Sequence, residues 1–223
     1  MEKIPIVVIG GATASGKTAL SIALAKRYGG RIISADSMQI YRRMDIGSAK
    51  PTMEERAGIR HELMDIAEPT ENYSVADYVQ AAHLAIADAH ANNELPIVVG
   101  GTGLYINSLV DDIEFQEVAA DPALRAALTK SAEQDGGAAL YGELKRIDPE
   151  AAEKIQPQNL RRVIRAVEVF RLTGKTISQQ QRESRKKTSR YLPLMMAISW
   201  NREILYDRIN QRVDQMVLDG LFL

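Results

Sequence analysis

The chain has 223 residues and a net charge of −1, and with 45% hydrophobic and 26% charged residues its composition is ordinary for a soluble globular protein. This length suits one sizeable domain with an insertion, or two small domains. Cysteine is absent, which excludes disulfides and thiolate metal sites, and no apolar run approaches the roughly 18 residues that a membrane span needs.

The first predicted elements are a strand over residues 4–9 and a helix over residues 18–28. Because the N-terminus runs directly into the strand, no signal peptide is visible, and we expect a cytoplasmic protein. The loop between the two elements fits the phosphate-loop pattern G-x-x-x-x-G-K-S/T, whose fixed positions are Gly11, Gly16, Lys17 and Thr18.

Glycines in such a loop let successive backbone N–H groups turn inward, and the N-terminus of the helix adds partial positive charge. The motif further predicts that Lys17 reaches terminal phosphate oxygens and that Thr18 contacts a Mg²⁺ ion. The loop is therefore predicted to bind a phosphorylated ligand, but the motif does not decide whether that ligand is a nucleotide such as ATP. The residues assigned to this site are Gly11, Ala12, Thr13, Ala14, Ser15, Gly16, Lys17 and Thr18.

The next predicted elements alternate between strands and a helix. Short apolar runs predict three further strands, over residues 31–35, 96–99 and 194–199. A helix is predicted over residues 75–91, where Ser74 and Asp77 resemble a capping box. Strands separated by helices indicate an α/β fold, in which a parallel sheet carries helices on both faces. Trp200, after the last strand, is interpreted as a packing residue.

Between residues 121 and 181 the pattern is purely helical. Asp121-Pro122 and Asp148-Pro149 each resemble an N-cap followed by proline at the first helical position. An apolar stripe marks a later helix, closed by Gly174, and its members are Leu160, Val163, Ile164, Val167 and Phe170. Because a sheet strand follows, we interpret this stretch as an all-helical insertion. Residues 1–115 and 191–223 then form the phosphate-loop core domain, and residues 116–190 form the insertion.

The insertion concentrates positive charge. Residues 161–190 contain ten Lys or Arg and two acids, a local charge of +8 that leaves −9 for the remainder of the chain. Such a block indicates a docking site for a polyanion, although a solvated helix face explains a charge run equally well. The segment SRKKTSR around Lys186 is predicted to be a mobile, basic connector.

Polar residues follow the ends of the predicted strands, where open parallel sheets bind their ligands. Asp36 directly follows the second strand, and Gly100, Gly101 and Thr102 follow the third. Asp36 is placed to act as a general base or a magnesium ligand, or simply to cap a turn. Thr102 is placed to offer a hydroxyl and an N–H group to phosphate, or to occupy a tight glycine turn. Their convergence with Lys17 on one sheet edge favours a functional site.

Six segments, in chain order, resemble the tRNA dimethylallyltransferase family: GATASGKT, DSMQIY, MDIGSAKP, GGTGLYI, RRVIRAVEVF and RINQRVDQM. The resemblance extends over essentially the whole chain. Members transfer an isopentenyl (dimethylallyl) group from dimethylallyl diphosphate to the exocyclic N6 amine of the adenosine 3′-adjacent to the tRNA anticodon. The resemblance thus implies that the phosphate loop holds a diphosphate leaving group. Members continue beyond the position of Leu223 with helical sequence that contacts tRNA, which we expect this chain to lack.

The resemblance also implies roles for individual residues. Lys17 and Mg²⁺ would stabilise the diphosphate, Asp36 would accept the amine proton, and Thr102 would contact the diphosphate side. Arg208 and Arg212 resemble two late arginines, of which one reaches diphosphate. Contacts with the anticodon stem-loop of tRNA are implied for Asp36, Ser37, Met38, Gln39, Thr102, Arg125, Arg161, Arg162, Val163, Ile164 and Arg165. No membrane partner is implied, and we expect a monomer.

Three other functions stay open on the sequence. A small-molecule kinase of the phosphate-loop class would use Asp36 as the base for a substrate hydroxyl. An isopentenyltransferase acting on free adenine nucleotides would use similar chemistry. Neither needs a basic helical insertion. A nucleic-acid binding module with a relic phosphate loop would bind RNA without any requirement for a diphosphate.

Overall fold

The structure is a computed structural model that describes residues 2–113, 121–184 and 188–222. The chain divides into two compact units, which we call the sheet unit (residues 1–113 with 189–223) and the helical unit (residues 114–188). The boundaries expected from the sequence, after residues 115 and 190, lie two residues later. Residues 185–187 of the expected basic connector lie outside the described residues.

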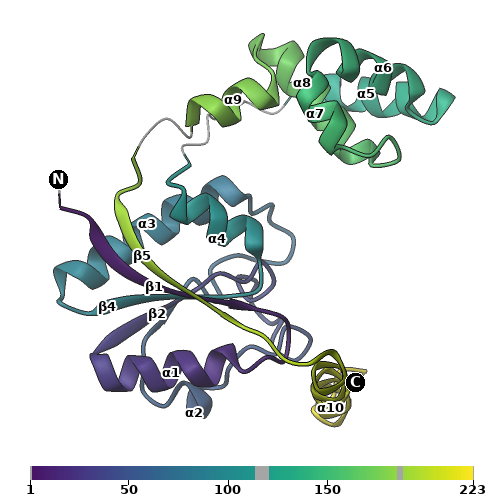
Figure 1. Ribbon diagram of the computed structural model, residues 1–223. Helices are drawn as coiled ribbons and strands as arrows, with labels where there is room; N and C mark the ends of the chain where they lie inside the picture. The colour runs from purple at the N-terminus through teal and green to yellow at the C-terminus, as the bar shows by residue number, and fades with distance from the viewer. Residues whose placement is uncertain (1, 114–120, 185–187, 223) are drawn as a thin grey trace. The chain divides into compact units, whose positions relative to one another are not determined.

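The sheet unit is built on five parallel strands in the order β3-β2-β4-β1-β5, so the predicted α/β fold with a parallel sheet is confirmed (Figure 1). The strands are β1 (Ile4–Gly11), β2 (Gly30–Ser34), β3 (His61–Glu62), β4 (Leu95–Val99) and β5 (Tyr191–Ile198). β5 begins three residues before the predicted strand, because it pairs with β1 along its whole length, from Ile4 opposite Tyr191 to Gly11 opposite Ile198. The two-residue strand β3 was not predicted.

Helices cover both faces of this sheet (Figure 1). α1 (Lys17–Tyr28) packs on the face formed by the apolar side chains Val7, Ile9, Ile32, Ile97 and Val99. α3 (Val75–Ala91) and α4 (Gly103–Val110) pack on the opposite face, against Ile6, Val8, Ile33 and Val98. Alternate residues of each strand thus point to opposite faces, as the pleat requires. The short α2 (Met53–Arg56) and the C-terminal α10 (Arg202–Leu218) complete the sheet unit.

The start of α3 confirms the predicted capping box. The Ser74 hydroxyl accepts the Asp77 N–H at 3.2 Å, and the Asp77 carboxylate accepts the Ser74 N–H at 2.8 Å. These two bonds satisfy backbone donors that a helix start otherwise leaves free, which fixes the first residue of the helix.

The ends of β2 and β4 approach each other closely because residue 100 is glycine. A Cβ atom there would lie 2.0 Å from the Ala35 carbonyl oxygen, so no other residue fits without moving the backbone. The Ala35 N–H donates to the Val99 carbonyl at 2.7 Å, and the Thr102 N–H returns to the Ala35 carbonyl at 3.2 Å. The loops that follow these two strands therefore start side by side.

The helical unit contains α5 (Pro122–Asp135), α6 (Ala138–Ile147), α7 (Pro149–Lys154), α8 (Leu160–Thr173) and α9 (Ile177–Ser184). Both predicted N-caps are confirmed, since the Asp121 and Asp148 carboxylates accept backbone N–H groups three residues on, at 2.9 and 3.1 Å. Four members of the predicted stripe of α8, Leu160, Val163, Ile164 and Val167, lie in the apolar core of the helical unit, and Gly174 ends α8 with a left-handed φ of 70°.

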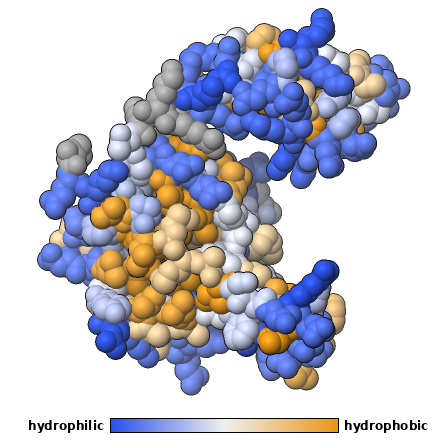
Figure 2. All heavy atoms as spheres, viewed as in Figure 1, coloured by the Kyte–Doolittle hydropathy of each residue, from blue (hydrophilic) through white to orange (hydrophobic). Residues whose placement is uncertain are grey.

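Apolar side chains are unevenly distributed over the surface. Figure 2 shows them gathered over the sheet unit, whereas the helical unit is mostly hydrophilic on the face shown. β5 contributes exposed Leu192, Leu194 and Met195. Among the described residues, no helix combines the length and the apolar character that crossing a membrane requires.

Candidate active site

A cavity of about 590 Å³ opens where β1, β2 and β4 end. Its walls come from the phosphate loop and the start of α1, from the loops after β2 and β4, and from α10. Its lining residues include Thr13, Ala14, Ser15, Gly16, Lys17, Thr18, Asp36, Gln39, Gly100, Gly101, Arg208, Gln211 and Arg212. The structure therefore brings the three loops that follow the predicted strand ends to one place, and adds a helix from the far end of the sequence.

The phosphate loop is shaped by residues with positive φ. Gly11 has φ 147°, and a Cβ atom on it would lie 2.9 Å from the Ile198 carbonyl oxygen. Gly16 has φ 97° and immediately precedes α1. Glycine tolerates both conformations, which lets the loop turn tightly at its two ends.

The Lys17 ammonium is directed into this loop. Its Nζ donates to the Gly11 carbonyl at 2.9 Å and to the Ala12 carbonyl at 2.6 Å. Burial lowers the pKa of Lys17, Arg212 lowers it further, and Asp36 acts in the opposite direction. Lys17, Arg212 and Asp36 are thus close enough to interact electrostatically, and two cations face one carboxylate across the cavity.

Two residues that follow β5 donate hydrogen bonds to backbone carbonyls of the phosphate loop. The Trp200 indole N–H donates to the Ser15 carbonyl at 2.8 Å, and the Arg208 Nε donates to the Ala14 carbonyl at 2.7 Å. The Arg208 guanidinium also lies 4.9 Å from the centre of the Trp200 ring, within the range of a cation–π interaction. Trp200 is therefore a packing residue, as expected, and what it packs on is the phosphate loop.

Arg212 is less fully engaged than Arg208. Its Nη2 donates to the Ser48 carbonyl at 3.2 Å, while its buried Nε has no hydrogen-bond partner among the described residues. Burial lowers the pKa of Arg212, and Asp36 opposes that shift. A guanidinium has five N–H donors, so Arg212 retains donors for a ligand in the cavity.

The Asp36 side chain caps a local turn, whereas the Thr102 side chain bonds a residue far away in the sequence. The Asp36 Oδ1 accepts the Met38 N–H at 2.9 Å, so the turn-capping role is present, yet Asp36 also lines the cavity. The Thr102 Oγ1 accepts the Ser37 N–H at 3.0 Å and donates to the Ser37 hydroxyl at 3.3 Å. Of the described residues in this loop, Gly100 and Gly101 rather than Thr102 line the cavity. Thr102 thus joins the loop after β4 to the loop after β2.

The candidate tRNA contacts of the helical unit fall into three groups. Arg161 and Arg162 are exposed on α8. Arg125 and Arg165 contact Glu168, a fully buried carboxylate that Arg125 binds through Nε at 3.0 Å and Nη2 at 2.8 Å. The remaining two, Val163 and Ile164, are buried in the core of the helical unit.

We expect Glu168→Gln to destabilise the protein by about 1–3 kcal/mol at neutral pH, because it weakens charged hydrogen bonds to a buried group. Burial raises the pKa of Glu168, but the hydrogen bonds and the positive charges of Arg125 and Arg165 together lower it overall. The stabilisation is therefore present above the unfolded pKa, about 4.3, and is lost as pH falls through the lower folded pKa. Thermal unfolding between pH 3 and 7 measures this, and an unchanged pH dependence in the variant would contradict it.

Comparison with known proteins identifies the family. The IPP transferase family matches residues 39–223. A tRNA dimethylallyltransferase of Acetivibrio thermocellus is 52% identical over 216 residues, which are 97% of this chain and 69% of that protein. One of Caldanaerobacter subterraneus subsp. tengcongensis is 50% identical over 220 residues, 98% of this chain and 70% of that protein. The chain belongs to the IPP transferase family.

Solved structures of IPP transferases resemble the whole chain. One is the crystal structure of a full-length tRNA isopentenylpyrophosphate transferase from Bacillus halodurans, whose sequence is 45% identical to this chain. The match has a TM-score of 0.66 and covers 99% of this chain and 68% of that protein. A eukaryotic dimethylallyltransferase acting on tRNA is 32% identical with a TM-score of 0.83, and covers 97% of this chain while 54% of its own length is matched.

Some residues in and around this site were given no role from the sequence. Lys50 and Ser48 lie in a loop without regular structure, and each has one partner far away in the sequence: Lys50 contacts Asp65, and the Ser48 carbonyl accepts from Arg212. Gln211 lines the cavity one residue before Arg212. All three fall in segments that resemble the family, MDIGSAKP and RINQRVDQM, but the resemblance implied no role for them.

Proposed function

We propose that this protein transfers a dimethylallyl group from dimethylallyl diphosphate to the exocyclic N6 amine of the adenosine 3′-adjacent to the anticodon in tRNA, and releases diphosphate. The observation that carries the proposal is one cavity, in a member of the IPP transferase family, lined by Lys17, Arg212 and Asp36. Two cations suit a diphosphate, and a carboxylate suits an amine that must lose a proton. A tRNA substrate fits the cytoplasmic location expected from the sequence.

The phosphate loop would stabilise the leaving group. Breaking the allylic C–O bond leaves negative charge on the diphosphate, and donors that are already oriented stabilise that charge without reorganising. The backbone N–H groups of the phosphate loop and the Lys17 ammonium would provide such donors. Arg212 adds a half-buried guanidinium with an unused Nε, which favours it over Arg208 as the arginine that reaches diphosphate, since the Arg208 Nε is bound to the loop itself.

The cavity residues also fit the Mg²⁺ ion that the phosphate-loop motif implies. Magnesium takes oxygen ligands, usually one or two from protein, and completes its shell with water and substrate phosphates. The Thr18 hydroxyl is such an oxygen ligand and lines the cavity. Held by Thr18 together with the substrate's phosphate oxygens and water, Mg²⁺ would neutralise charge that develops on the diphosphate.

Asp36 would act at the other end of the reaction. As the adenine N6 atom forms its bond to the allylic carbon, its N–H becomes acidic, and a carboxylate within hydrogen-bond reach accepts the proton. The Asp36 Oδ1 is held by the Met38 N–H, and no hydrogen bond to its Oδ2 is formed among the described residues. The fixed carboxylate therefore keeps one oxygen for this step.

The experiment that tests the proposal is incubation with dimethylallyl diphosphate, Mg²⁺ and unmodified tRNA, followed by mass analysis of the nucleosides. We expect one adenosine of the anticodon loop to gain a dimethylallyl group, with stoichiometric release of diphosphate. Hydrolysis of ATP without prenyl transfer would favour a kinase. Transfer to free adenine nucleotides that tRNA does not inhibit would favour a nucleotide isopentenyltransferase.

We expect the double variant Arg161→Gln/Arg162→Gln to bind tRNA more weakly and with a shallower salt dependence. Each lost phosphate contact reduces the slope of log affinity against log salt by about 0.7 for single strands and 0.9 for duplex. Both side chains are exposed on α8, so their loss should leave the unit folded. A salt titration of tRNA binding measures the slope.

The matched control is Lys130→Gln/Arg146→Gln, which removes the same charge from exposed positions elsewhere on the helical unit. Dimethylallyl diphosphate affinity should be that of the wild type in both variants. An Arg161/Arg162 variant with an unaltered slope would identify that face of α8 as a solvated surface without a partner.

A further inference from the structure

After β2 the chain runs from Asp36 to Pro51 without helix or strand, apart from one isolated bridge between Tyr41 and Ala67. We call residues 36–51 the Asp36 loop. It supplies Asp36 and Gln39 to the cavity, and the Ser48 carbonyl to Arg212. Four backbone hydrogen bonds join residues 39–42 to residues 65–67. Residues 43–51 form backbone–backbone bonds only within the loop, among the described residues, so the position of this later part depends on side-chain contacts.

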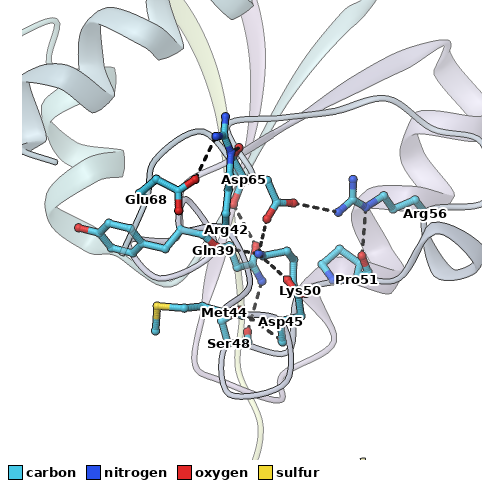
Figure 3. Close-up of polar contacts among 12 residues, drawn as sticks. Gln39, Arg42, Met44, Asp45, Ser48, Lys50, Pro51, Arg56, Asp65 and Glu68 are labelled. Carbon is cyan, nitrogen blue, oxygen red and sulfur yellow. Dashed lines mark hydrogen bonds and ion pairs between the residues drawn. The ribbon is translucent and has the colours of Figure 1, made fainter. Parts of the chain in front are cut away.

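Lys50 makes the most extensive of these contacts (Figure 3). Its side chain is only 3% exposed, and its Nζ lies 2.8 Å from the Tyr41 carbonyl, 2.6 Å from the Asp45 Oδ1 and 2.6 Å from the Asp65 Oδ1. An ammonium has three N–H donors, and all three are used here. Lys50 therefore has no donor left for a substrate, and it is not among the residues that line the cavity.

Hydrogen bonds connect the partners of Lys50 to the cavity wall. The Asp65 N–H donates to the Gln39 carbonyl at 3.2 Å, and the Gln39 Nε2 donates to the Ser48 carbonyl at 3.5 Å. The same Ser48 carbonyl accepts the Arg212 Nη2 at 3.2 Å. The part of the loop that orients Arg212 is thus bracketed by Tyr41, Asp45 and Lys50 itself.

Removal of the Lys50 charge would leave Asp45 and Asp65 without their shared cation, although among the described residues Arg56 also lies 3.9 Å from Asp65. The two carboxylates are 65% and 41% exposed, so water would solvate their charges, and the main loss would be the three bonds that the buried ammonium makes. Tyr41, Asp45 and Asp65 would no longer be tied to one point, and the loop between residues 41 and 50 would be held less firmly.

We propose that Lys50 is a positioning residue for the transfer reaction, which holds the Asp36 loop so that the Ser48 carbonyl directs Arg212 toward the diphosphate. This inference rests on the proposed function. Its consequence is specific: loss of Lys50 weakens diphosphate binding and slows transfer, while tRNA binding through the helical unit is unaffected.

The test is Lys50→Met, which keeps the length of the side chain and removes its charge and donors. The probe is inorganic diphosphate, and the signal is the fluorescence of Trp200, the single tryptophan, which contacts the phosphate loop. A displacement of about 1 Å in a catalytic group costs up to roughly 10²-fold in rate. We expect kcat to fall by about 10- to 100-fold and the diphosphate Kd to rise, with the KM for tRNA unchanged.

Lys26→Met is the matched control, since Lys26 is exposed on α1. A second variant, Asp45→Asn, removes one partner of Lys50 at a carboxylate that is 65% exposed, so its folding is less at risk. It should shift diphosphate affinity in the same direction by a smaller factor, and it decides the question if Lys50→Met does not fold.

The outcomes separate this inference from the proposed function. If the wild type binds diphosphate and the folded variants bind it equally well with wild-type kcat, Lys50 has a purely structural role and the inference is overturned alone. If the wild type neither binds diphosphate nor prenylates tRNA, the proposed function fails and the role of Lys50 fails with it. Weaker diphosphate binding by the variants, with unchanged tRNA binding, supports both.

Discussion

Lys17→Ala is expected to lower the single-turnover rate of prenyl transfer by at least about 10²–10³-fold, the effect of removing one preorganised donor from a developing anion. Lys17 is the phosphate-loop cation, half-buried beside Arg212, and its pKa is lowered by burial and by that neighbour. The Lys17 charge is therefore poorly solvated in the empty cavity, so its interaction with a bound diphosphate is stronger than it would be in water. Rapid-quench measurement with saturating substrates isolates the chemical step.

The fold should tolerate the Lys17 substitution. Among the described residues, Lys17 donates to two carbonyls of its own loop, Gly11 and Ala12, and to no other group. The matched control is Lys26→Ala on the exposed side of the same helix, for which we expect wild-type rates. Near-normal single-turnover transfer by Lys17→Ala would remove the phosphate loop from the mechanism.

Asp36→Asn is expected to retain substrate binding and to lose about 10²–10⁴-fold in transfer rate, the usual contribution of a general base. The amide is nearly isosteric, and its oxygen still accepts the Met38 N–H that fixes the side chain in its turn. What it loses is the ability to accept the proton of the adenine amine. Comparing kcat with separately measured tRNA and diphosphate affinities distinguishes the two roles.

Asp214→Asn is a suitable control for Asp36→Asn, because Asp214 is an exposed carboxylate on α10 outside the cavity lining. If Asp36→Asn instead loses tRNA affinity while its rate at saturation is normal, Asp36 positions the substrate. The base would then have to be sought elsewhere in the cavity.

Much of the fold was accessible from the sequence, because its signals are local. The capping box at Ser74, the Asp-Pro starts at residues 121 and 148, and the glycine at position 174 each act within a few residues, and the structure has them where the patterns predict. The strand β3 has only two residues, too few for any pattern. The beginning of β5 was missed because its pairing with β1, not its own composition, determines where it starts.

The candidate site was less accessible, because its contacts join distant parts of the sequence. Asp36 and Lys17 could be placed together from strand order alone. No spacing rule, however, pairs Lys50 with Asp65, Arg125 with Glu168, or Trp200 with Ser15. The strand order predicts a Thr102 hydroxyl beside the phosphate loop, but only the side-chain geometry shows that this hydroxyl is bonded to Ser37.

The position of β5 beside β1 has a consequence for synthesis of the chain. β1 is completed at Gly11, but the strand that covers its outer edge begins at Tyr191, after the entire helical unit. At the usual rates of translation the 75 residues from 114 to 188 take roughly 4–15 s to make. During that interval β1 is an open edge, which is a template for incorrect pairing. The nascent sheet therefore lacks its last strand until the helical unit has been translated. The translation rate of that unit sets how long a chaperone would have to protect the β1 edge.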